Sequence, residues 1–172
     1  MLSLEGVVPF LILAGSAALH ESGHIAALLR AGYRYRRIDI LPMGALIVGP
    51  EGMPDRDELA VALAGPAFSA AAAILSAALY AFTGGVYPLF SACINSFLFA
   101  FNLIPNKNLD GGKALYCFVS QKYEKETAER ICPAVSAAFT AVFFVFAAAM
   151  WLVSGKNAGV LILFVSLASQ LI

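Results

Sequence analysis

The sequence is poor in charged residues. Asp, Glu, Lys and Arg make up only 13% of its 172 residues, whereas 60% are hydrophobic. With a mean hydropathy of +0.81, this composition excludes an ordinary soluble domain and predicts an integral membrane protein of one domain. The formal net charge is zero, so nothing in the charge balance indicates nucleic acid binding.

Cysteine and histidine are also scarce. The three cysteines, Cys93, Cys117 and Cys132, are odd in number and scattered, which argues against both a disulfide framework and a cysteine-type zinc site. No internal repeat, nucleotide-binding loop or low-complexity tract is present. The only two histidines, His20 and His24, lie in one short motif, and the chemistry of the chain is therefore expected there.

Long apolar runs are what the sequence does have. They cover residues 7–29, 59–82, 86–104, 131–153 and 158–172. The first four have the roughly 20 residues that a spanning helix needs, and the fifth is shorter, as in a tilted or truncated span. We therefore expect an all-α polytopic membrane protein in which residues 1–172 form a single transmembrane domain.

Basic residues are concentrated in two of the connections between these runs. One connection lies between the first two runs and the other follows the third; their basic residues are Arg30, Arg34, Arg36, Arg37 and Arg56, and Lys107, Lys113, Lys122, Lys125 and Arg130. Positively charged loops are retained on the cytoplasmic side of a membrane. The pattern predicts that both connections are cytoplasmic and that the N-terminus faces the opposite side.

The motif His20-Glu21-Ser22-Gly23-His24 lies inside the first apolar run. Residues four apart share one helix face, so His20 and His24 can offer two imidazole nitrogens to one zinc. Glu21 projects roughly 100° away, where it can reach a metal-bound water and act as general acid/base. A chance match is the alternative, but an unpaired Glu in hydrocarbon costs a few kcal/mol, which favours a functional role.

A third ligand is expected after the third apolar run. Pro105 disfavours helix at the preceding residue, and the following Asn-rich stretch with Gly111-Gly112 permits a tight irregular turn. Such a turn could aim Asp110 back toward the helices, and irregular backbone at membrane depth is tolerated around a buried polar site. The alternative is an ordinary cytoplasmic loop containing an Asp-Gly turn.

These motifs together resemble the site-2 protease family of intramembrane zinc metalloproteases. The resemblance rests on His20-Glu21-x-x-His24, on Asn102-x-x-Pro105 followed by Leu109-Asp110-Gly111, and on Ala64-Gly65-Pro66 in the second run. It covers about the first 120 residues, the expected three-helix catalytic core, with residues 121–172 forming C-terminal helices.

The resemblance implies a role for each matching residue. His20, His24 and Asp110 would bind Zn²⁺, Glu21 would be the general acid/base, and Asn102 would hold substrate or a developing oxyanion. Two positions depart from the family pattern: Lys107 stands where members often have proline, and Ser69 where they often have asparagine. Neither position is a ligand, so the departures concern loop stiffness and substrate handling.

Residues 37–51 form an apolar, β-branched stretch interrupted by Pro42 and Gly44. It is too short and broken to span, and it predicts a membrane-associated hairpin or re-entrant strand. In the resembled family a strand near the site pairs with an unwound substrate, a geometry that would expose a peptide bond. The alternative is a hairpin that packs without touching substrate.

The function expected from these features is cleavage of a peptide bond in or near a transmembrane segment of a membrane protein substrate. The site would face the cytoplasm from a bacterial inner membrane, with a regulatory membrane partner, and the compact core resembles the branch that processes a sporulation sigma-factor precursor. The alternatives are a zinc-binding transporter or sensor, which has no need of Glu21 as a base, and a catalytically silent scaffold.

Overall fold

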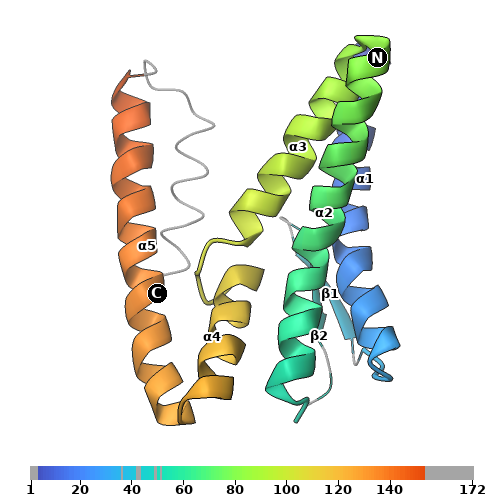
Figure 1. Cartoon of the computed structure of the whole chain (residues 1–172). Coiled ribbons are helices and arrows are strands. Elements are labelled where there is room, and N and C mark those ends of the chain that lie inside the picture. Colours follow the sequence, from blue (N-terminus) through green and yellow to red (C-terminus); the bar gives the residue numbers. More distant parts are fainter. Residues whose placement is uncertain (1–3, 36, 42–43, 49, 51, 154–172) are drawn as a thin grey trace. The chain divides into compact units, whose positions relative to one another are not determined.

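The computed structural model describes residues 4–35, 37–41, 44–48, 50 and 52–153 (Figure 1). Its described part is helical apart from one short hairpin. The chain divides into two compact units, Met1–Leu103 and Ile104–Ile172. The fifth apolar run, residues 158–172, lies outside the described residues, and the assignment of residues 1–172 to one domain stays a prediction.

Three helices build the first unit: α1 (Leu4–Arg30), α2 (Asp55–Thr83) and α3 (Val86–Asn102). They coincide within a few residues with the first three apolar runs, and both α2 and α3 pack against α1 (Figure 1). The link between α2 and α3 is short because Gly84 ends α2 in the left-handed conformation, with φ 63°, and its N–H bonds to the Tyr80 carbonyl. The two helices therefore turn back on each other directly.

The hairpin consists of β1 (Arg37–Leu41) and β2 (Gly44–Val48), which pair antiparallel with Ile38 opposite Ile47. Strand β2 contacts α1. Tyr33, before the hairpin, donates its hydroxyl to Asp57 Oδ2 at 3.0 Å, and this hydrogen bond raises the pKa of Tyr33. The membrane association of the hairpin stays a prediction.

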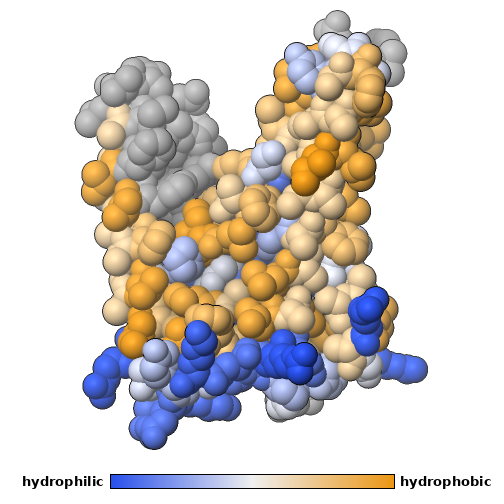
Figure 2. Space-filling model, in the orientation of Figure 1, coloured by the Kyte–Doolittle hydropathy of each residue, from blue (hydrophilic) through white to orange (hydrophobic). Residues whose placement is uncertain are grey.

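The surface agrees with an integral membrane protein. Within the described residues one helix, Asp55–Thr83, is long and apolar enough by itself to cross a membrane, and Val86–Asn102 is a shorter apolar helix. In Figure 2 hydrophobic residues cover most of the visible surface of the first unit, and hydrophilic residues gather at the end where α1 ends and α2 begins. The number of spans stays a prediction.

Helices α1 and α2 approach closely because small residues lie at their contact. A Cβ added to Gly23 would come within 2.7 Å of the Ala64 carbonyl oxygen and 2.9 Å of the Phe68 ring, closer than real contacts allow. Gly23 belongs to the His-Glu-x-x-His motif and Ala64 to the Ala-Gly-Pro element. The two motifs therefore lie against each other within the first unit.

The second unit contains α4 (Asp110–Lys122) and α5 (Lys125–Val153). Its core is formed by Val119, Ala128 and Cys132, with Leu115 and Tyr116 packed against them. Helix α5 includes the fourth apolar run, residues 131–153, and begins six residues before it. The turn between the helices ends α4 at Tyr123, whose extended backbone still donates to the Val119 carbonyl.

The loop before α4 differs from the sequence-based expectation in one respect. Helix α3 ends at Asn102, three residues before Pro105, and Gly111 and Gly112 lie in the first turn of α4 instead of in an irregular turn. The physical reason is close packing: a Cβ on Gly112 would collide with the backbone of Asn106. Gly112 is needed for this approach of loop and helix, not for a flexible turn.

Candidate metal centre

His20 and His24 lie on one face of α1, as their spacing predicts, and both are buried within the protein. Their Nε2 atoms are 3.3 Å apart. Two nitrogens that each lie 2.0–2.1 Å from a tetrahedral zinc are about 3.3–3.4 Å from each other. The separation of the two Nε2 atoms therefore fits two ligands of one tetrahedral metal ion.

The other ring nitrogen of each histidine is held by α2. His20 Nδ1 lies 2.9 Å from Ser69 Oγ, and His24 Nδ1 lies 2.8 Å from the backbone oxygen of Val61. A carbonyl oxygen only accepts, so the proton of neutral His24 is on Nδ1 and the lone pair of Nε2 is available for a metal. Metal-binding histidines commonly donate their second N–H in this way, because it fixes ring orientation and tautomer.

Gly65 makes room for the His24 ring. A Cβ on Gly65 would collide with Nε2 of His24 and lie 2.8 Å from its Cδ2. The next residue, Pro66, is inside α2 and supplies no N–H, so the helix lacks the hydrogen bond that residue 66 would otherwise donate to the Ala62 carbonyl. The Ala-Gly-Pro element therefore forms the wall against which His24 packs.

Glu21 is half-buried on α1 between the two histidines in sequence. A helix rotates about 100° per residue, so the Glu21 carboxylate is expected to project from the face of α1 next to the one that bears the two imidazoles. This direction suits a group that acts on a metal-bound water while the two histidines hold the metal. The direction of the Glu21 carboxylate and its role both stay predictions.

The other two predicted site residues stand at the ends of helices. Asn102 is the last residue of α3 in the first unit, and its Nδ2 donates to the Leu98 carbonyl at 3.0 Å. Asp110 is the first residue of α4 in the second unit and is only 7% exposed. A buried carboxylate requires a partner. The metal-binding role of Asp110 and the catalytic role of Asn102 stay predictions.

Known proteins that are similar to this chain include the following three. A zinc metalloprotease of Methanocaldococcus jannaschii is 29% identical over 149 residues, which are 84% of this chain and 44% of that protein. Stage IV sporulation protein FB of Bacillus subtilis is 32% identical over 118 residues, 66% of this chain and 41% of that protein. The chain thus spans less than half the length of the curated relatives it matches, and no family model matches it.

The third match is a solved structure of a site-2 protease from Methanocaldococcus jannaschii. Its TM-score is 0.69 at 25% sequence identity, and the alignment covers 99% of this chain and 80% of that one. This agreement extends over nearly the whole chain. In sequence and in fold, the chain is similar to the site-2 protease family. This similarity agrees with the helical fold and with the paired histidines of α1.

Three contributors to this site were given no role at the site from the sequence. Ser69, noted there only as a departure from the family pattern, is fully buried and contacts His20 Nδ1. The sequence feature that could have indicated a role for Ser69 is its position on α2, three residues after Pro66; in the structure both residues are buried. The Val61 backbone oxygen carries no sequence signal at all, because any residue supplies a carbonyl. Gly65, noted there only as part of the Ala64-Gly65-Pro66 element, packs against His24 itself.

Proposed function

We propose that the chain is an intramembrane zinc metalloprotease that hydrolyses a peptide bond in or near a membrane-spanning segment of another protein. The observation that carries this proposal is the 3.3 Å separation of the two Nε2 atoms, with both Nδ1 atoms held by α2 and Glu21 adjacent. Similarity to known proteins supports it, since these include a zinc metalloprotease and a site-2 protease.

We propose Asp110 as the third zinc ligand. His20, His24 and Asp110 each offer one ligand atom, and all three residues are buried. Two imidazole nitrogens and one carboxylate oxygen are a donor set that catalytic zinc sites use, with the fourth position left to water or substrate. Among the described residues this group contains no cysteine, so its donor set is not that of a thiolate-rich structural site.

The residues of the chain would divide the chemistry as follows. Bound zinc supplies a Lewis acid that polarises water and the scissile carbonyl. The Glu21 carboxylate takes a proton from the attacking water as its oxygen bonds to the carbonyl carbon, and passes that proton to the departing amine as the C–N bond breaks. An N–H of Asn102 donates to the carbonyl oxygen while negative charge develops on it.

Three finer statements belong to the same proposal. The site faces the cytoplasm, because the basic connections on either side of the catalytic segments are retained there by the positive-inside rule. The hairpin β1–β2 pairs with the unwound substrate as an added strand. The substrate is a membrane-anchored precursor of the kind processed in sporulation, for which the 32% identity to Stage IV sporulation protein FB is the support.

The test compares the wild-type chain with Glu21→Gln during co-expression with a panel of membrane-tethered candidate substrates. Because Gln cannot accept the proton, cleavage should fall by about 10²–10⁴-fold. Zinc content, measured on the purified protein, should be unchanged because Glu21 is not proposed as a ligand. Equal fragment yields from both forms, or no fragments from any substrate while zinc is bound, would contradict the proposal and leave a zinc transporter or sensor.

A further inference from the structure

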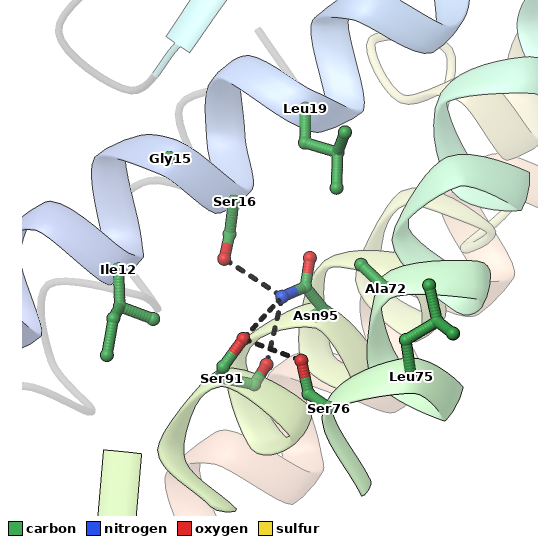
Figure 3. Close-up of a pocket in the computed structure, with 9 residues that line it drawn as sticks. All are labelled: Ile12, Gly15, Ser16, Leu19, Ala72, Leu75, Ser76, Ser91 and Asn95. Carbon is green, nitrogen blue, oxygen red and sulfur yellow. Dashed lines mark hydrogen bonds between the residues drawn. The ribbon is translucent and has the colours of Figure 1, made fainter. Parts of the chain in front are cut away.

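A pocket of about 340 Å³ lies among α1, α2 and α3, all within the first unit (Figure 3). Its polar lining consists of Ser16 from α1, Ser76 from α2, and Ser91 and Asn95 from α3. Leu19 and Leu75, both exposed, supply part of its apolar lining. The helices that hold the imidazole pair thus also border an open, mainly apolar pocket with four polar side chains in its lining, and the metal site does not use this pocket.

The side chain of Asn95 connects the polar groups that line this pocket. Its Nδ2 donates to Ser16 Oγ and to the Ser91 carbonyl, each at 2.9 Å, and the Ser91 and Ser76 hydroxyls lie 2.9 Å apart (Figure 3). A carbonyl cannot donate, so the contact with Ser91 fixes which end of the amide is nitrogen. The amide oxygen therefore points away from these partners.

Asn95 Oδ1 is buried and has no hydrogen-bond partner among the described residues. The whole side chain is only 2% exposed. Buried polar atoms of native proteins nearly always have a partner, whether protein or ordered water. The aliphatic side chains of Leu19 and Leu75 offer no donor, and neither would a lipid acyl chain, so the missing donor must come from something that enters the pocket.

We propose that the pocket is a hydrated compartment within the apolar helices of the first unit, and that Asn95 Oδ1 binds one of its water molecules. Water occupies about 30 Å³ per molecule in the liquid, so the pocket has room for several molecules beside its polar side chains. Water also needs two to four polar partners, which Asn95 and the three serines supply. The low exposure of Asn95 favours a donor this small over the main chain of a peptide.

The compartment lies beside the metal centre. Ser16 precedes His20 by four residues on α1, a distance of about 6 Å along the helix. On α2 the pocket-lining Ala72 follows Ser69, the partner of His20, by three residues. The water is therefore stored one helical turn from the imidazole pair, on the side away from Arg30. If the proposed protease function holds, this compartment supplies hydrolytic water from within the bilayer.

The test is the water accessibility of a cysteine placed in the pocket. Ser76→Cys changes one atom at a pocket-lining position, and α2 contains no native cysteine. The thiolate, which forms where water is present, attacks the sulfur of a small charged methanethiosulfonate, forms a mixed disulfide and displaces methanesulfinate. The matched control is Ile74→Cys, two residues earlier at similar depth, whose native side chain is 69% exposed on the apolar surface. Site-resolved mass spectrometry gives the labelling rate of each in membranes.

We expect Ser76→Cys to be labelled at least 10-fold faster than Ile74→Cys. Adding Asn95→Leu, which removes the water-binding amide, should bring the rate down toward that of the control. Equal rates at positions 76 and 74 would overturn the hydrated compartment, and labelling that ignores Asn95→Leu would overturn the assignment to Asn95. Labelling should be the same when Glu21→Gln is added, so this result does not depend on whether the chain cleaves peptides.

Discussion

At the scale of single residues, the motif on α1 is completed by groups on α2. Ser69 contacts the ring nitrogen of His20 that faces away from the proposed metal, and the Val61 carbonyl does the same for His24. Partners of this kind orient the ligand ring, and their loss typically reduces metal affinity or activity 10–100-fold. Ser69 stands where members of the resembled family often have asparagine, so the side chain that contacts His20 Nδ1 is a different one in this chain.

Ser69→Ala should lower zinc affinity about 10–100-fold, because it removes the hydrogen-bond partner of His20 Nδ1 while changing the buried volume little. The measurement is zinc competition with a chromophoric chelator on the purified protein. Thr83→Val is the control, since Thr83 also bears a hydroxyl on α2 but bonds to the Leu79 carbonyl at the far end of the helix. Unchanged zinc affinity in Ser69→Ala would show that Ser69 does not position His20.

At the scale of elements, the start of α4 depends on a close approach between loop and helix. The loop is itself ordered by Asn106, which is buried, receives the N–H of Asn108 on Oδ1 at 3.0 Å and donates Nδ2 to Thr140 Oγ1 at 3.1 Å. The backbone of Asn106 then packs on Gly112. These contacts of the second unit fix the start of α4, and with it the position of Asp110, the first residue of that helix.

Gly112→Ala should destabilise the protein by about 1–3 kcal/mol or more, because the new methyl group collides with backbone that cannot move aside. The measurement is thermal unfolding in detergent, followed together with zinc content. Gly6→Ala on α1 is the matched control, since a Cβ there meets nothing within 4 Å and alanine favours helix. Unfolding of Gly112→Ala at the temperature of the control would contradict the packing argument.

At the scale of the whole molecule, the proposed zinc ligands come from distant parts of the sequence. His20 and His24 lie on α1, and Asp110 is the first residue of α4. A ligand that binds only the folded state stabilises it by mass action, about 2.7 kcal/mol at a free concentration 100 times the dissociation constant. Zinc bound by these residues would therefore stabilise the folded chain.

Zinc removal by a chelator should therefore lower the unfolding temperature of the wild-type protein, and Asp110→Asn should abolish most of this zinc dependence. The measurement is unfolding in detergent with zinc and with chelator for both forms. Glu126→Gln, in the first turn of α5, serves as the control because it removes an acidic group of the same unit without touching the proposed ligands. A zinc-dependent shift in Asp110→Asn equal to that of wild type would exclude Asp110 as a ligand.

The sequence by itself determined the local properties of this protein. Apolar runs located α1, α2 and α3 within a few residues, the spacing of His20 and His24 placed both on one helix face, and the motifs pointed to the family. All of these depend on residues near each other in the chain, where helix periodicity is sufficient to predict the outcome. The end of α3 near Pro105 was predicted only to within three residues, because helix ends depend on local packing.

Only the tertiary structure decided which distant groups meet. The Val61 carbonyl at His24, the hydroxyl of Ser69 at His20 and the place of Gly65 beside the His24 ring all follow from the packing of α2 on α1. The pairing of Asn95 with Ser16, 79 residues earlier, follows from the packing of α3. Every residue has a backbone carbonyl, and every glycine lacks a side chain, so the sequence does not distinguish the Val61 carbonyl or Gly65 from others of their kind. They acquire a role only because α2 packs against α1.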